Sequence, residues 1–215
     1  TRGSGAVFFS GCPLRCVYCQ NREISRGLAG ASVSVERLAE IFMELQEQQD
    51  NNINLVTAGH YLPQVREALR LAKGRGLSVP VVYNTSSYEK PEALRMLEGL
   101  VDIYLPDLKY LDPDLAGNYS KALDYPERAM EAIQEMVRQV PEPEFDSRGI
   151  MKKGVIVRHL LLPGHVREGK RIVRYLHETY GNRIYISLMN QYTPTEAVKT
   201  DSLLGRKATK REYER

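Results

Sequence analysis

Residues 11–21 of this 215-residue chain read Gly-Cys-Pro-Leu-Arg-Cys-Val-Tyr-Cys-Gln-Asn and contain its three cysteines, Cys12, Cys16 and Cys19. An apolar run at residues 6–10 comes directly before them, so we expect the cysteines in the loop that follows the first strand. Three cysteines in one tight group are a poor disulfide framework and favour a metal site in a reducing compartment. Thiolates suit iron–sulfur clusters, and three of them on a four-iron cube would leave one iron open to a small molecule.

Zinc is the alternative to an iron–sulfur cluster. A structural zinc ion takes four ligands, and the chain has no fourth cysteine. A site of three cysteines and one histidine stays open, with the histidine drawn from His60, His159, His165 and His177. The C-x3-C-x2-C spacing is unusual for zinc, so it favours the cluster and leaves a non-catalytic metal-binding module as a remote alternative.

Short apolar runs alternate with stretches of helical periodicity along the chain. The runs predict buried strands at residues 6–10, 54–57, 79–85, 102–106, 155–162 and 184–189. The periodic stretches predict helices at residues 34–48, 62–73, 91–100, 126–140 and 166–180, whereas residues 111–124 and 141–153 are expected to be polar loops. This βα alternation predicts an α/β fold with a parallel sheet, either open and doubly wound or a partial barrel.

The bulk composition is that of an ordinary globular protein, with 42% apolar and 27% charged residues. The net charge of +3 is too small to indicate a nucleic-acid-binding face, and no apolar run approaches the ~18 residues of a membrane helix. We therefore expect one cytoplasmic domain over residues 1–215 that binds neither nucleic acid nor membrane. We also expect segments to be missing at both ends, because the cysteines follow closely on residues 1–3 and a helical pattern begins just before residue 215.

The pattern Cys-x3-Cys-x-aromatic-Cys after a first strand resembles the signature of the radical S-adenosylmethionine (radical SAM) superfamily. The whole chain is similar to the branch of pyruvate formate-lyase activating enzyme, through the stretches FFSGCPLRCVYCQN, NINLVTAGH, PVVYNTSSY, DIYLPDLKY and VRHLLLPG. This resemblance implies a partial (β/α)6 TIM-like barrel with a [4Fe–4S] cluster on the three cysteines. It also implies an oxidoreductase that reductively cleaves SAM to a 5′-deoxyadenosyl radical, which abstracts hydrogen from a substrate.

The resemblance further implies that SAM lies at the carboxyl ends of the strands. After the second strand, Gly59 would allow close backbone approach, and His60 departs from the Gly-Gly-Glu segment that is usual in the family. His60 is therefore a candidate for SAM contact or proton transfer, or else an ordinary loop histidine. After the third strand, Asn84 and Thr85 are candidates for SAM contact or for plain turn chemistry. Tyr18 is expected near the adenine, mainly through its backbone.

The fourth and fifth strands carry charged residues. Asp107 and Lys109 alternate with a leucine, so both are expected on one side of the strand end, where the family's Asp-Leu-Lys segment binds polar groups of SAM. On the fifth strand Arg158 and His159 interrupt an apolar run and must face opposite ways; we expect Arg158 to face the pocket and count it with His60 as a catalytic candidate. His165 is a further candidate for SAM contact.

The sequence leaves the substrate open. Residues 189–192, at the end of the sixth strand, are expected on the substrate side. By resemblance the chain is an activase that installs a glycyl radical on a partner enzyme; the alternative is a radical SAM enzyme that modifies a small molecule or a peptide. Either activity needs a one-electron donor such as flavodoxin or ferredoxin.

Overall fold

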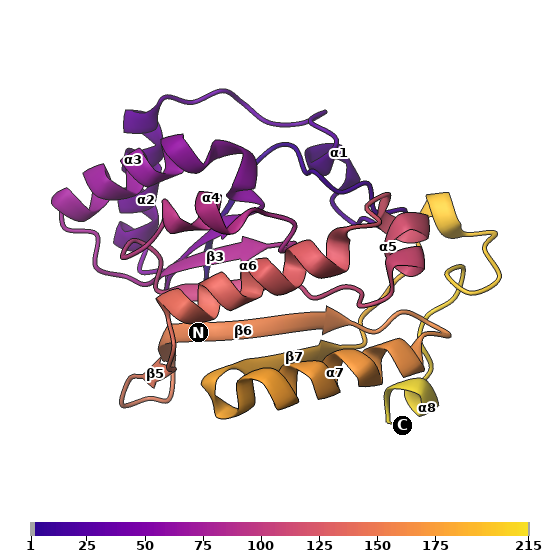
Figure 1. Cartoon of the computed structure of the whole chain (residues 1–215). Helices are drawn as coiled ribbons and strands as arrows, with labels where there is room; N and C mark the ends of the chain where they lie inside the picture. Colours follow the sequence, from indigo (N-terminus) through magenta and orange to yellow (C-terminus); the bar gives the residue numbers. More distant parts are fainter. Residues whose placement is uncertain (1–2, 215) are drawn as a thin grey trace.

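The computed structural model of the chain describes residues 3–214 (Figure 1). The expectation of missing terminal segments rests partly on residues 1, 2 and 215, which lie outside the described residues.

Six parallel strands form one sheet in the order in which they occur in the sequence. They are β1 (Gly5–Phe8), β2 (Ile53–Val56), β3 (Val81–Thr85), β4 (Ile103–Pro106), β6 (Met151–Leu160) and β7 (Tyr185–Met189). Within the described residues no pairing joins β7 to β1, so the sheet is not closed. In a doubly wound sheet the spatial order of the strands reverses at a switch point. In a barrel the strands follow one another in space in the same order as in the sequence. The partial barrel is therefore confirmed over the doubly wound alternative.

The connecting helices cover the outer face of this curved sheet, and Figure 1 shows α6 and α7 lying alongside β6 and β7. The helices are α1 (Arg22–Ser25), α2 (Val35–Glu47), α3 (Leu62–Gly74), α4 (Pro91–Arg95), α5 (Pro113–Ser120), α6 (Tyr125–Gln139), α7 (Val166–Tyr180) and α8 (Lys210–Tyr213), with the 3-10 turns η1 (Ala58–Tyr61), η2 (Gly181–Arg183) and η3 (Glu196–Val198). The five predicted helices are all present. Ser34 caps α2 as a serine before a periodic run should, since its hydroxyl accepts a hydrogen bond from the Arg37 N–H at 3.1 Å.

Two predicted loops are wrong, and one predicted helix is too long. Residues 111–124 contain α5, because Asp112 accepts hydrogen bonds from two backbone N–H groups of the first turn and Pro113 occupies its first position. Residues 141–153 contain the short strand β5 (Glu144–Phe145), which pairs antiparallel with the start of β6. Helix α4 ends at Arg95 rather than at residue 100.

The hydrophobic core lies between the sheet and the helices. Side chains on the outer face of the strands, such as Leu55 and Tyr83, are fully buried against helical residues such as Val65 and Leu69. Burial of this kind is worth about 1.5–3 kcal/mol for each large apolar side chain. The core therefore holds the sheet from outside and leaves polar side chains on the inner face free to form a site.

Candidate active site at the carboxyl ends of the strands

The three cysteines lie in the loop between β1 and α1 and are all partly buried. They line one cavity of about 320 Å³, which opens over the carboxyl ends of β1, β2, β3, β4 and β6. The other walls of this cavity include Asn54, Asn84, Thr85, Asp107, Lys109 and Arg158. The structure thus brings the cysteine loop together with the polar residues that the sequence predicts at the third, fourth and fifth strand ends.

Backbone contacts hold the cysteine loop in place. Gly11 has a φ of 93°, a conformation that favours glycine, and its N–H donates to the Ile24 carbonyl at 2.8 Å. The Arg15 N–H donates to the Ser120 carbonyl at 3.0 Å, which ties the loop to the end of α5. The Arg15 guanidinium also donates to the Cys12 carbonyl at 3.2 Å. Backbone hydrogen bonds to α1 and α5 therefore hold the cysteine loop against the cavity.

The thiols lie in surroundings that disfavour ionisation in the absence of a metal. Burial raises the pKa of both Cys12 and Cys16, although the nearby Lys109 ammonium opposes this shift. A metal centre removes the thiol proton outright, because the cations that replace it supply the missing positive charge. Metal binding would therefore offset the cost of ionising Cys12 and Cys16 in these surroundings.

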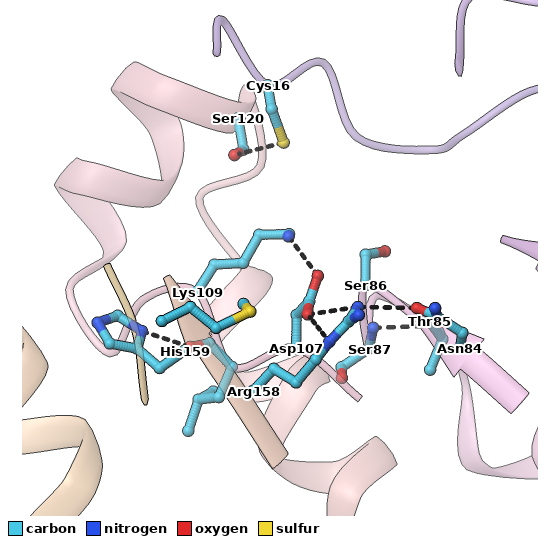
Figure 2. Close-up of polar contacts among 12 residues, drawn as sticks. Cys16, Asn84, Thr85, Ser86, Ser87, Asp107, Lys109, Ser120, Arg158 and His159 are labelled. Atoms are coloured by element: carbon cyan, nitrogen blue, oxygen red, sulfur yellow. Dashed lines mark hydrogen bonds and ion pairs between the residues drawn. The ribbon is translucent and has the colours of Figure 1, made fainter. Parts of the chain in front are cut away.

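Three charged residues that line the cavity form an ion-pair group, whose contacts are drawn in Figure 2. The Lys109 ammonium lies 2.6 Å from one carboxylate oxygen of Asp107, and the Arg158 guanidinium lies 2.8 Å from the other. Arg158 also donates to the Asn84 side-chain oxygen at 2.7 Å. The prediction that Asp107 and Lys109 share one side of the strand end is confirmed, and so is the prediction that Arg158 faces the pocket.

This ion-pair group, Asp107, Lys109 and Arg158, carries a net charge of +1. Burial alone would raise the pKa of Asp107, but the two cations more than offset it and hold that pKa below its usual range. Burial alone would lower the pKa of Lys109, but the Asp107 carboxylate reverses the shift and raises it. Asp107 and Lys109 are therefore charged at neutral pH, and an arginine side chain always carries its charge in a protein. The excess cation is suited to an anionic ligand group such as a carboxylate.

His159 points away from the cavity, as predicted. Its ring is buried, and its Nδ1 lies 2.8 Å from the Leu108 carbonyl oxygen. Burial lowers its pKa, so the ring is neutral at neutral pH. We conclude that His159 fastens β6 to the segment after β4 rather than contacting a ligand.

Gly59 and Thr85, which the sequence predicts at the second and third strand ends, both lie against the carboxylate of Glu89. Sequence reasoning missed Glu89. The Thr85 hydroxyl donates to one Glu89 oxygen, and the Tyr83 hydroxyl donates to the other at 2.6 Å. A Cβ on Gly59 would come within 3.2 Å of the same carboxyl group, so the glycine allows η1 to pack against it. Nothing local in the sequence marks Glu89, because its partners lie on β3 and in the loop after β2.

His60 and His165 lie at the margins of the site. His60 is exposed, and a Cβ on Gly11 would come within 3.4 Å of its ring, so it flanks the cysteine loop. The His165 Nε2 lies 3.0 Å from the Tyr119 hydroxyl, and burial lowers the pKa of this histidine. Contact of either ring with SAM stays a prediction.

A second cavity, also of about 320 Å³, adjoins the first and shares Asp107, Lys109 and Arg158 with it. Tyr18 forms part of its wall and packs edge-on against Tyr192, with ring centroids 6.1 Å apart. The remaining wall includes Leu160, Met189, Gln191 and Thr193. Of the residues expected on the substrate side, Met189, Gln191 and Tyr192 line this second cavity and Asn190 does not. The ion-pair group borders both cavities, whereas the three cysteines line only the first.

Comparison with known proteins agrees with this geometry. A model of the radical SAM superfamily matches residues 6–176. The chain belongs to the radical SAM superfamily. Enzymes of this superfamily use a [4Fe–4S] cluster and SAM, and the two cavities of this radical SAM chain lie where its strands end.

The chain is also similar in sequence to two curated proteins. An uncharacterized protein of Methanocaldococcus jannaschii is 26% identical over 99% of this chain and 60% of its own length. A pyruvate formate-lyase-activating enzyme of Clostridium pasteurianum is 27% identical over 74% of each protein. The chain therefore spans less than two thirds of the first relative.

Solved radical SAM structures share the fold. Methylornithine synthase (PylB) has a TM-score of 0.62 at 12% identity, over 94% of this chain and 57% of that protein. The structure of anSMEcpe with bound AdoMet has a TM-score of 0.57 at 12% identity, over 91% of this chain and 54% of that protein. At these identities the likeness concerns the fold, which confirms the partial barrel.

The donor set fits a cube better than a single ion. Within residues 3–214, no three side chains of His, Cys, Asp and Glu stand close enough to hold one metal ion. A four-iron cube takes each thiolate on a different iron, so its ligands stand further apart around a shared cavity, which is how Cys12, Cys16 and Cys19 are arranged.

Within residues 3–214, no helix has the length and apolar character needed to span a bilayer.

Proposed function

We propose that this radical SAM enzyme holds its [4Fe–4S] cluster on Cys12, Cys16 and Cys19. One observation carries the proposal: the three cysteines share a cavity with the ion-pair group of Asp107, Lys109 and Arg158. When bound, the cluster and SAM supply reductive cleavage of the sulfonium and a 5′-deoxyadenosyl radical that abstracts hydrogen. The chain's own residues bind and orient the reactants.

Lys109 and Arg158 are the groups that would hold the methionyl carboxylate of SAM. Their two positive charges exceed the single negative charge of Asp107, and both residues line the cavity. Asp107 positions the two cations, so an ammonium group approaching it would meet net repulsion. This arrangement favours a contact of Lys109 and Arg158 with the SAM carboxylate over a contact of Asp107 with the SAM ammonium group. Asn84, Thr85, Gly59 and His60 complete the proposed SAM surroundings.

Binding measurements test this assignment. Arg158→Met removes one charge-assisted hydrogen bond, worth about 1.5–3 kcal/mol, so we expect the Kd for SAM to rise by at least about tenfold. Arg174→Met changes an exposed arginine of α7 in the same way and should leave the Kd unchanged. Equal affinities of the Arg158 variant and the wild type for SAM would exclude Arg158 from the carboxylate site.

We propose that the hydrogen donor is presented in the second cavity, beside Tyr18 and Met189. The similarity to the Clostridium pasteurianum activating enzyme supports a glycyl-radical activase, whose substrate would be a loop of a partner enzyme. A radical SAM enzyme acting on a small molecule or another peptide is the second candidate. Incubation with SAM, a reductant and candidate glycyl radical enzymes from the same host, followed by electron paramagnetic resonance (EPR), separates the two: a glycyl radical signal supports the activase.

A one-electron donor is the second proposed partner, and a basic surface over the cysteine loop suits it. The surface consists of the exposed residues Arg15, Arg22, Arg26 and Lys121, interrupted by Glu23. Its net charge of +3 equals that of the whole chain, so the rest of the chain is neutral on balance. A positive surface above the cysteines would steer an acidic flavodoxin or ferredoxin to the cluster. Reduced cysteines and such a donor also support the proposed cytoplasmic location.

A further inference from the structure

Three buried hydroxyl groups form a hydrogen-bonded chain that ends on a cysteine sulfur. Cys16 Sγ lies 3.0 Å from the Ser120 hydroxyl, and the Ser120 hydroxyl lies 3.0 Å from the Tyr110 hydroxyl. The Tyr110 hydroxyl in turn bonds the hydroxyl of Tyr18. Ser120 and Tyr110 are at most 1% exposed and Tyr18 is 8% exposed, so the chain runs through the protein interior. Figure 2 shows its end at Cys16 and Ser120.

The direction of the protons follows from counting donors. A cysteine that binds iron is a thiolate and has no proton to give, so the contact at Cys16 requires Ser120 to donate to the sulfur. The Ser120 hydroxyl has one proton, so Tyr110 must donate to Ser120. By the same count Tyr18 donates to Tyr110. All three hydroxyl dipoles then point toward the sulfur, and hydrogen bonds in such a series strengthen one another.

We propose that this chain makes Ser120 a positioning residue that raises the reduction potential of the cluster. The inference rests on the proposed function. Reduction adds an electron and makes the cluster more negative, and a hydrogen bond donated to a ligand sulfur stabilises the more negative state. The effect is strong here because the donors are buried and screening by water is weak. Tyr18 lies between Cys16 and Cys19 in the sequence and thereby acts on the Cys16 sulfur through Tyr110 and Ser120.

The loop contains a matched comparison at another cysteine. Cys19 Sγ lies 3.4 Å from the Ser25 hydroxyl, which is a similar pairing of sulfur and serine. The Ser25 hydroxyl, however, donates its single proton to the Arg22 carbonyl at 3.2 Å. The Arg22 carbonyl therefore competes with a thiolate at Cys19 for the Ser25 proton, whereas the Ser120 hydroxyl contacts Cys16 and Tyr110, and Tyr110 donates to it. The same substitution at the two serines isolates the donated hydrogen bond from a change in size or polarity.

The test is a redox titration of the anaerobically reconstituted holoprotein, with the reduced cluster followed by EPR. We expect Ser120→Ala to make reduction less favourable by about tenfold, a downward shift of about 59 mV for a one-electron couple. Tyr110→Phe keeps the Ser120 donor but removes the polarising group behind it, so we expect a smaller shift in the same direction. Ser25→Ala should leave the potential at the wild-type value.

A Ser120→Ala potential equal to that of the wild type, or a shift matched by Ser25→Ala, would overturn the proposal. Should Ser120→Ala assemble no cluster, Tyr110→Phe decides instead, and an unchanged potential in that variant overturns the proposal. A wild-type chain that assembles no cluster would contradict the proposed function. A cluster whose reduction potential does not depend on Ser120 would contradict only the present inference.

Discussion

Replacing Asp107 by asparagine should destabilise the fold, because it leaves two partly buried cations without their shared anion. Lys109 and Arg158 lie 2.6 and 2.8 Å from the two carboxylate oxygens, and the side chains of the group are only 17–23% exposed. Removing one partner of a buried pair costs about 3–5 kcal/mol, and the partial exposure places this group near about 3 kcal/mol. That is a large part of the 5–15 kcal/mol that stabilises a typical domain.

Urea unfolding of the metal-free protein under reducing conditions measures the loss. Glu196→Gln breaks the exposed pair with Lys199, whose side chains are 66–87% exposed, and should leave the free energy of unfolding unchanged. The double variant Asp107→Asn/Lys109→Met removes one cation together with the anion and should recover part of the loss.

The pH dependence of the Asp107→Asn effect gives a second readout. The pKa of Asp107 is lowered by folding, so its stabilising effect is complete above the unfolded value of about 3.9 and is lost as the pH falls through the folded value. The difference between wild type and variant should therefore stay constant from pH 8 to about pH 4 and narrow below it. A variant within about 0.5 kcal/mol of the wild type at pH 7 would refute the view that Asp107 holds the two cations.

Two further predictions concern the basic surface and the buried histidine. The double variant Arg22→Glu/Arg26→Glu should slow SAM cleavage driven by an acidic protein donor several-fold at low salt, yet leave dithionite-driven cleavage unchanged. The matched control is Arg66→Glu/Arg70→Glu on α3, which makes the same charge change elsewhere on the surface. An equal loss of rate in both double variants would contradict a specific docking surface. His159 has a lowered pKa, so below about pH 6.5 the unfolded chain takes up a proton that the folded chain does not. Wild-type stability should fall there by up to about 1.4 kcal/mol per pH unit, and equilibrium unfolding from pH 7.5 to 5.5 should show a shallower fall for His159→Gln.

The elements that were predictable from the sequence are those with a local signature. The buried runs and the periodic stretches each carry their own pattern, so six parallel strands and five helices were found in order. Helix α5 was missed although Asp112 and Pro113 form a helix-start signal, because the stretch is polar and shows little periodicity. The pairing of β5 with β6 depends on a turn between them, and its strand residues Glu144 and Phe145 are exposed.

The residues of the site also divide into those with a local sequence signature and those without one. The cysteine spacing and the alternation of Asp107 with Lys109 are local, and the structure confirms that these groups converge. The contact of Ser120 with Cys16 joins residues 104 positions apart, and the Arg158–Asn84 contact joins residues 74 apart. Such contacts depend on how α5 and β6 pack against the first strands. Sequence reasoning therefore identified the residues of the ion-pair group and not the hydroxyl chain behind the cysteines.

The central claim is that three cysteines and an ion-pair group form one site for reductive SAM cleavage. Its most direct measurement is the yield of 5′-deoxyadenosine from SAM after anaerobic reconstitution with iron and sulfide and reduction with dithionite. We predict a brown protein with about four irons per chain that forms 5′-deoxyadenosine, and a Cys16→Ala variant that loses both the cluster and the product. A colourless wild-type protein, or one that forms product equally well without Cys16, would contradict the account.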